Sequence, residues 1–257
     1  MKKILDLKVV IKKWITSTDF LLQLKAEEKL PEIKPGQFAE ILVDNSNDVF
    51  LRRPFSIHDF DYKNQTVDFL IQIKGKGTQQ LSNKEKGDII NVMLPLGNSF
   101  TVSESDNYVL LVGGGCGVAP LMSLAKTINQ KSNKVHILIG AKTKKALLRV
   151  DEYKKYGNIF CTTEDGSFGE KGFVTEHSLM NNIRTYEMIY VCGPEPMMKA
   201  VAKIAKKNQI ECEVSLENTM ACGIGACLCC VTETVDGNMC TCTDGPIFNV
   251  NKLKWQI

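Results

Sequence analysis

Cysteine spacing near the C-terminus constrains this chain more than any other feature. Seven of its ten cysteines lie between Cys212 and Cys242, and three stand in the order C-x4-C-x2-C at Cys222, Cys227 and Cys230. With Cys242 as a distal fourth, this is the ligand spacing of a plant-type 2Fe-2S cluster. Such a cluster transfers single electrons, so the sequence predicts a one-electron carrier that works with other redox groups.

Spacing alone leaves the fourth ligand open, because Cys229 and Cys240 also lie nearby. We favour Cys242, since the turn sequence Asp244-Gly245-Pro246 follows it, and interpret the other two as buried thiols or near-cluster residues. A zinc site is the main alternative, because paired cysteines often bind zinc. Its ligands would be Cys227, Cys230, Cys240 and Cys242. Structural disulfides fit less well, since we find no signal peptide and cytosolic thiol clusters usually bind metal.

Length and charge indicate a soluble, cytoplasmic protein of more than one domain. A chain of 257 residues exceeds the usual size of one domain. The formal net charge of +3 is spread along the chain, apart from a modest lysine group at 142, 144 and 145. This gives no compositional support for binding nucleic acid or a membrane surface. The apolar runs at 108–112 and 135–140 are too short to cross a bilayer and are interpreted as buried strands.

Three segments of the chain differ in their patterning. Residues 8–102 hold short alternating apolar runs between turn residues, which is typical of an antiparallel β barrel. Residues 107–210 follow the order strand, glycine loop, helix and strand, which predicts a doubly wound α/β domain. The tail is rich in glycine and cysteine and is expected to be organised by its cluster. We therefore expect domains at 1–102, 103–210 and 211–257.

Within the barrel segment, the string Arg53-Pro54-Phe55-Ser56 resembles the flavin-binding domain of the ferredoxin-NADP reductase superfamily. The strings Pro35-Gly36-Gln37-Phe38 and Gly75-Lys76-Gly77-Thr78 reinforce the resemblance. An arginine can bind pyrophosphate oxygens with its two-pronged guanidinium, and a serine can hydrogen-bond the flavin ring. Gly77-Thr78 is expected to open a helix whose free N–H groups face FAD phosphate. The backbone of Leu70, Ile71 and Gln72 would run along the flavin.

The α/β segment carries Gly113-Gly114-Gly115-Cys116-Gly117-Val118-Ala119-Pro120 directly after an apolar strand. It is not a strict G-x-G-x-x-G, but proline suits the first turn of a helix, and Gly115 and Gly117 allow close approach of a phosphate. The superfamily resemblance extends to Cys192-Gly193-Pro194-Glu195-Pro196-Met197, where the cysteine is expected beside the nicotinamide during hydride transfer. Cys116 and Cys161 are interpreted as buried structural thiols.

An acidic pair indicates the nicotinamide preference. Glu164 and Asp165 follow a strand and would repel a 2′-phosphate while accepting hydrogen bonds from free ribose hydroxyls, which favours NADH. The positively charged lysines at 142, 144 and 145 have the opposite effect on the nucleotide preference, because they would attract a 2′-phosphate.

The whole chain resembles the electron-transfer subunit family of NAD-dependent dihydroorotate dehydrogenase B. The resemblance rests on the order barrel, nicotinamide domain and cluster, and on two strings, Met220-Ala221-Cys222-Gly223-Ile224-Gly225-Ala226-Cys227 and Cys242-Thr243-Asp244-Gly245-Pro246-Ile247-Phe248. It implies an FMN-containing catalytic partner that oxidises dihydroorotate in pyrimidine biosynthesis, assembled as a heterotetramer of two of each subunit. Electrons would pass from FMN through the 2Fe-2S cluster to FAD and then to NAD.

No residue of this chain is assigned as an acid or base. Its three histidines, His58, His136 and His177, lie in no nucleophile or general-base motif, so dihydroorotate chemistry is expected in the partner. The apolar residues Ile224 and Leu228 are candidates for the interface with that partner.

Two other functions remain open from the sequence. The nearer is the small subunit of a bifurcating ferredoxin-NADP oxidoreductase or a sulfide dehydrogenase. That family carries an aspartate ligand in its cluster loop, where this chain has Cys222. The more distant is a zinc-stabilised binding module, which would leave the FAD and nicotinamide strings unexplained.

Overall fold

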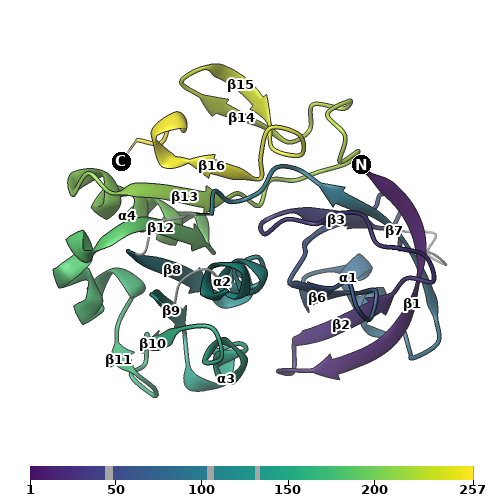
Figure 1. Cartoon of the computed structure of the whole chain (residues 1–257), viewed down its shortest axis with the longest axis horizontal. Coiled ribbons are helices and arrows are strands. Elements are labelled where there is room, and N and C mark those ends of the chain that lie inside the picture. Colours follow the sequence, from purple (N-terminus) through teal and green to yellow (C-terminus); the bar gives the residue numbers. More distant parts are fainter. Residues whose placement is uncertain (44–48, 103–106, 131–133, 257) are drawn as a thin grey trace.

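Alternating apolar residues build the first sheet, which is the predicted antiparallel barrel. The computed structural model describes residues 1–43, 49–102, 107–130 and 134–256. Along the first strand Leu5, Leu7 and Val9 are buried, while the residues between them point outward. The strands are β1 (Lys3–Trp14), β2 (Asp19–Lys25), β3 (Phe38–Ile41), β4 (Arg53–Ser56), β5 (Asp59–Asp61), β6 (Thr66–Gln72) and β7 (Ile89–Leu96). They pair antiparallel in the order β4-β3-β7-β1-β2-β6-β5, and the helix α1 (Lys76–Ser82) follows β6 (Figure 1).

A second, mainly parallel sheet forms the α/β domain. Its strands are β8 (Tyr108–Gly114), β9 (Val135–Ala141), β10 (Asn158–Thr163), β11 (Glu170–Lys171), β12 (Tyr186–Cys192), β13 (Glu211–Ser215) and β16 (Ile247–Asn249). They lie in the order β11-β10-β9-β8-β12-β13-β16, and only β16 runs antiparallel to its neighbour. The central strands are continuous apolar runs because helices cover both faces.

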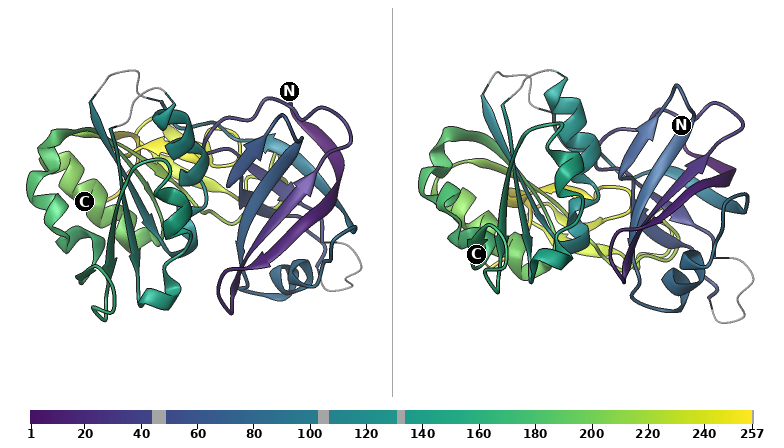
Figure 2. Two further views of the ribbon diagram at one scale, coloured as in Figure 1. Left: turned by 60° about the horizontal axis from the view of Figure 1, so that its bottom comes forward. Right: turned by 90° about the horizontal axis from the view of Figure 1, so that it is seen from below.

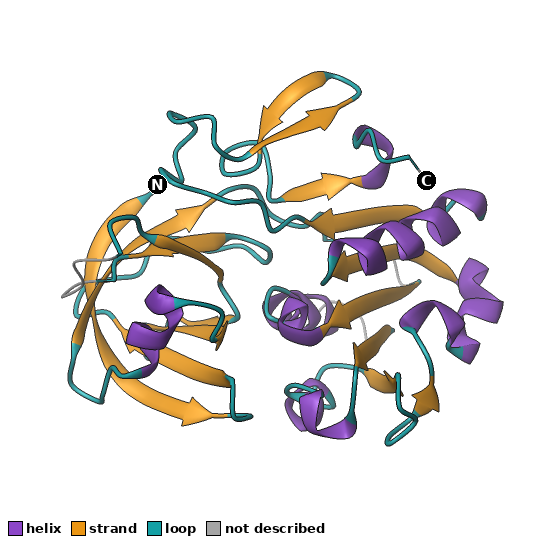
Figure 3. Cartoon of the chain, turned by 180° about the vertical axis from the view of Figure 1, so that it is seen from behind, coloured by secondary structure: helices purple, strands orange, loops and turns teal. Residues whose placement is uncertain are grey.

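Two helices cover opposite faces of this sheet. Helix α2 (Leu121–Asn129) packs with Val109 and Leu111 of β8, and α4 (Glu195–Lys207) packs on the side of Leu110 and Val112. Helix α2 therefore lies between the sheet and the barrel, as Figures 1 and 3 show. The short helix α3 (Val150–Tyr153) follows β9. Among the described residues, no helix combines the length and apolar character needed to cross a membrane.

The C-terminal tail is joined to both domains. Its first and last strands, β13 and β16, belong to the second sheet, and the hairpin of β14 (Val231–Thr234) and β15 (Gly237–Cys240) stands apart. The stretch between β13 and β14 crosses to the barrel (Figure 2). Asn98 fastens the tail, because its side chain binds the carbonyl groups of Asp244 and Ile247 at 2.8 and 2.9 Å. The expected boundary at 210 therefore stands just before a strand of the α/β sheet, and we propose to move it to about 216.

Candidate functional site

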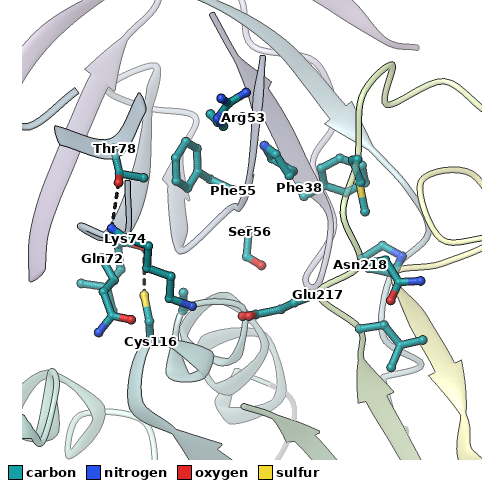
Figure 4. A pocket seen from close by; sticks show the side chains of 16 residues that line it. Phe38, Arg53, Phe55, Ser56, Gln72, Lys74, Thr78, Cys116, Glu217 and Asn218 are labelled. Carbon is teal, nitrogen blue, oxygen red and sulfur yellow. Dashed lines mark hydrogen bonds between the residues drawn. The ribbon is translucent and has the colours of Figure 1, made fainter. Parts of the chain in front are cut away.

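The barrel, the α/β domain and the tail meet around a cavity of about 260 Å³. The predicted residues Arg53, Pro54, Phe55, Ser56, Leu70, Gln72 and Thr78 line it from the barrel. Cys116 and Ala119 line it from the α/β domain, and Leu216, Glu217, Asn218, Met220 and Pro246 line it from the tail (Figure 4). The side chain of Ile71 is in the barrel core and does not line the cavity, and the contact of its backbone with the flavin remains a prediction.

One end of the cavity suits a diphosphate. The guanidinium of Arg53 is held by the Leu51 carbonyl at 2.8 Å and lies over the start of α1, where a Cβ on Gly77 would meet the arginine Nε at 3.1 Å. The Thr78 hydroxyl accepts from the amides of Lys74 and Gly75 at 2.9 and 3.1 Å and so shapes this turn. A fixed guanidinium beside a helix N-terminus is a binding arrangement for phosphate oxygens.

The other end of the cavity suits a flavin ring. The hydroxyl of Ser56 and the carboxylate of Glu217 both project inward there, whereas the aromatic ring of Phe55 lies nearer to Arg53 and Thr78 (Figure 4). Cys116, expected to be only a structural thiol, lies in the cavity wall and donates to the Leu70 carbonyl at 3.4 Å. Burial raises the pKa of this thiol to about 12, so it is neutral. The residues of this chain therefore fit FAD.

Sequence reasoning missed Glu217 and Lys74. Lys74 reaches across the cavity toward Glu217 (Figure 4). Glu217 stands two residues beyond β13, and ligands bind at the carboxyl ends of strands in such sheets. That position could have identified Glu217, had β13 been recognised as a strand of the α/β sheet.

The two predicted glycines of the nucleotide loop have different surroundings. Gly115 has a positive φ of 55°, and a Cβ there would meet nothing within 4 Å, so its backbone is open to a ligand. A Cβ on Gly117 would lie 2.5 Å from the Cys192 carbonyl oxygen. Gly117 is therefore required for packing against Cys192, and its contact with a nucleotide remains a prediction.

Cys192 is buried behind this loop and does not line the cavity. Its thiol is fully buried and has Ser215 as a hydrogen-bond partner. Burial, and secondarily the charge of Glu217, raises its pKa well above the ordinary range. The role of Cys192 beside the nicotinamide therefore remains a prediction.

Glu164 and Asp165 follow β10, at the sheet edge where β8 and β12 also end. Asp165 closes its own turn, because its carboxylate accepts from the hydroxyl and the amide of Ser167 at 2.6 and 2.9 Å. The hydroxyl, then the amide, lowers the pKa of Asp165. Glu164 is exposed, which leaves it the better placed of the pair to meet a ribose.

The sulfur atoms of the four predicted cluster cysteines interact with one another. The sulfur of Cys222 interacts with the Cys227 thiol, and that of Cys242 interacts with Cys230. Backbone amides, first that of Ile224, lower the pKa of Cys222 to about 6, which favours the thiolate that binds metal. Among the described residues, no three Cys, His, Asp or Glu side chains gather as one metal-ion site. The charge of Cys222 also raises the pKa of Cys242, so the two ends of the predicted ligand set lie near one another.

The surroundings of Cys242 support it as the fourth ligand. Its sulfur is buried and accepts from the amide of Gly225 at 3.1 Å, and its own amide donates to the Cys230 sulfur at 3.4 Å. Cys240 is half-buried and also interacts with Cys230, while its amide is bound by Asp244 at 2.7 Å. Cys229 is exposed. The choice of Cys242 therefore remains a prediction with structural support.

Comparison with known proteins adds two family matches. An oxidoreductase NAD-binding domain matches residues 111–203, and the iron-sulfur cluster binding domain of dihydroorotate dehydrogenase B matches residues 217–254. The second match includes all four predicted cluster ligands and favours an iron-sulfur site over zinc.

Curated relatives match over most of the chain. The electron transfer subunit of dihydroorotate dehydrogenase B (NAD(+)) from Caldanaerobacter subterraneus subsp. tengcongensis is 41% identical, covering 83% of this chain and 84% of that protein. Its counterpart from Fusobacterium nucleatum subsp. nucleatum is 40% identical with the same coverage.

Solved structures confirm the fold class. A NADH-dependent reduced ferredoxin-NADP oxidoreductase superposes with a TM-score of 0.87 at 30% identity, covering 97% of this chain and 90% of that one. The ferredoxin reductase of a carbazole 1,9a-dioxygenase reaches 0.71 at 21% identity, covering 81% and 67%, which supports the fold alone.

Proposed function

This chain belongs to the family of electron transfer subunits of NAD-dependent dihydroorotate dehydrogenase B, and we propose that it carries electrons between the catalytic subunit and NAD through a 2Fe-2S cluster and FAD. It is an NADH-linked oxidoreductase subunit with FAD, the cluster and NAD(H) as its cofactors. In this proposal it works in the cytoplasm.

The observation that carries the proposal is the meeting of three segments at one cavity. Met220 of the tail lines this cavity and precedes the cluster ligand Cys222 by two residues. Two residues of extended chain span at most about 7 Å. The flavin cavity and the cluster loop are thus adjacent, which suits electron transfer between them.

Each residue group has a separate task. Arg53 and the start of α1 hold the diphosphate, Phe55 offers an aromatic face beside them, and Ser56 orients the ring at the other end. Bound FAD supplies the exchange between two-electron hydride chemistry and one-electron transfer. Gly115 and Glu164 bind the nucleotide, and the loop through Gly117 fixes its distance from the ring. Cys222, Cys227, Cys230 and Cys242 hold the cluster.

The partner is the catalytic subunit, for which we propose bound FMN and a heterotetramer of two of each chain. Ile224 and Leu228 of the cluster loop are 51% and 64% exposed beside the ligand Cys227. Exposed apolar residues at a point of electron exit suit coverage by another protein.

A bifurcating ferredoxin-NADP oxidoreductase subunit is the second candidate, because the solved structure of such an enzyme matches nearly the whole chain. The curated relatives and the cluster-domain match favour the dihydroorotate dehydrogenase family.

Co-expression with the catalytic subunit tests the proposed function. The purified complex should reduce NAD with dihydroorotate, whereas this chain alone should only oxidise NADH with an artificial acceptor. If the two proteins do not associate, or if this chain alone oxidises dihydroorotate, the assignment is wrong.

A further inference from the structure

A buried histidine connects the two cofactor domains close to where they must exchange hydride. His58 follows Ser56 by two residues, in the connection between β4 and β5, and is fully buried. Its Nδ1 lies 2.9 Å from the carbonyl oxygen of Ala119, which belongs to the α/β domain. Its own carbonyl accepts from the amide of Ser123 in the first turn of α2 at 3.1 Å.

The chemistry of this contact fixes the state of the ring. A carbonyl oxygen only accepts hydrogen bonds, so Nδ1 carries the proton and donates it. Burial lowers the pKa of His58 to about 4, so the ring is neutral at physiological pH. Nε2 is then a bare acceptor, and among the described residues it has no partner. The ring is therefore anchored through Nδ1 alone.

This bond is one of the short links between the barrel and the nicotinamide loop, beside the contact of the Cys116 thiol with the Leu70 carbonyl at 3.4 Å. Ser56 lies two residues before His58, and Gly117 lies two residues before Ala119. Gly117 in turn packs so tightly on the Cys192 carbonyl that a Cβ would lie 2.5 Å away. The barrel side of the link is also fixed, because the His58 amide donates to the Asp68 carbonyl at 2.8 Å. The His58–Ala119 contact thus joins the barrel two residues from Ser56 to the loop two residues from Gly117.

We propose that His58 is a positioning residue for hydride transfer, acting through the Ala119 carbonyl to hold the nicotinamide loop at its working distance from the flavin. The inference rests on the proposed function. In the reaction concerned, the C4 hydrogen of NADH leaves with both electrons of its bond and adds to N5 of the flavin. NADH is oxidised and the flavin is reduced. Misplacement by about 1 Å can slow such a step by about 100-fold.

Two amide replacements provide the discriminating comparison. Asparagine places a side-chain N–H near the position of Nδ1, whereas glutamine places it near Nε2, and both are neutral primary amides. His58→Leu removes the donor. Lys126→Met serves as a matched control, because Lys126 makes another cross-domain contact, with Asp59 at 3.0 Å, on the same helix α2.

The measurement is anaerobic stopped-flow reduction of FAD by NADH in the purified holoprotein, with the nucleotide Kd and the long-wavelength charge-transfer absorbance recorded together. His58→Leu and His58→Gln should lower the limiting rate constant about 10- to 100-fold and weaken the charge-transfer band, with Kd changed less than about 3-fold. His58→Asn should recover most of the rate, and Lys126→Met should retain it.

Wild-type rates in His58→Leu, equal rates in the asparagine and glutamine variants, or equal slowing in Lys126→Met would overturn the role of His58. If His58→Leu does not fold, the comparison of the two amides decides. Failure of NADH to reduce the wild-type flavin is a distinct result, which overturns the proposed function itself.

Discussion

The carboxyl group of Glu40 lies directly beneath Gly223 of the cluster loop. A Cβ on Gly223, whose φ is +66°, would lie 2.7 Å from Cγ of Glu40. Glu40 is fully buried on β3, and within the described residues neither of its carboxyl oxygens has a hydrogen-bond partner. Desolvation raises its pKa to about 7, against the lowering effect of Arg52.

Glu40→Gln should therefore stabilise the protein at alkaline pH. The folded-state pKa of Glu40 exceeds its unfolded value of 4.5, so its contribution to stability is fully present below pH 4.5 and is lost as pH rises through 7. The shift corresponds to about 3 kcal/mol. Urea unfolding at pH 5.0 and 8.5 should show the advantage of the variant growing by that order. An advantage that is independent of pH would contradict the assignment.

Single replacements of cysteine by serine should distinguish the ligands of the cluster from the cysteines that only lie near it. Serine at 222, 227, 230 or 242 should weaken or abolish cluster incorporation, because each removes one thiolate. Cys229→Ser and Cys240→Ser are the matched controls and should retain iron and sulfide at wild-type ratios. A full cluster in Cys242→Ser together with its loss in Cys240→Ser would reassign the fourth ligand.

Arg53→Ala should release FAD. Removing the guanidinium from the diphosphate end should weaken binding by roughly 2–4 kcal/mol, which is about 30- to 1000-fold in Kd. Arg52→Ala is the control, since Arg52 binds the Asn91 carbonyl at 3.2 Å and does not line the cavity. Equilibrium dialysis that gives equal FAD affinities for the two variants would disprove the role of Arg53.

Glu164→Gln should narrow the preference of the chain for NADH over NADPH. The neutral side chain no longer repels a 2′-phosphate, so kcat/KM for NADPH should rise relative to that for NADH by about 10-fold. Asp165→Asn should change this preference less, because the carboxylate of Asp165 already accepts two hydrogen bonds from Ser167. Comparable kcat/KM for both nucleotides in the unmodified chain would exclude the preference altogether.

Local patterning was enough to predict the two sheets, and the resemblance of the barrel strings to a flavin-binding domain indicated the barrel side of the cavity wall. The short apolar runs of β2 and β6, and the buried run of β8 before its glycines, are properties of adjacent residues. Arg53, Pro54, Phe55 and Ser56 are consecutive residues, so the string could be recognised from the sequence alone.

The residues that were missed depend on contacts between distant segments. Strand β16 pairs with β13 across more than thirty residues of loop and hairpin, so the tail could not be assigned to the second sheet from its composition. Glu217 enters the cavity only because β13 ends beside it. In the sequence Glu40 resembles an ordinary strand glutamate, because its contact with the cluster loop depends on a segment far along the chain.

The central claim is that FAD stands between NADH and the cluster within this chain. Freeze-quench EPR after anaerobic mixing with NADH tests it most directly, with flavin absorbance followed in parallel. In the holoprotein the signal of the reduced cluster should follow flavin reduction, and in the FAD-depleted protein with its cluster intact it should not form. Reduction of the cluster by NADH at an equal rate without FAD would contradict the account.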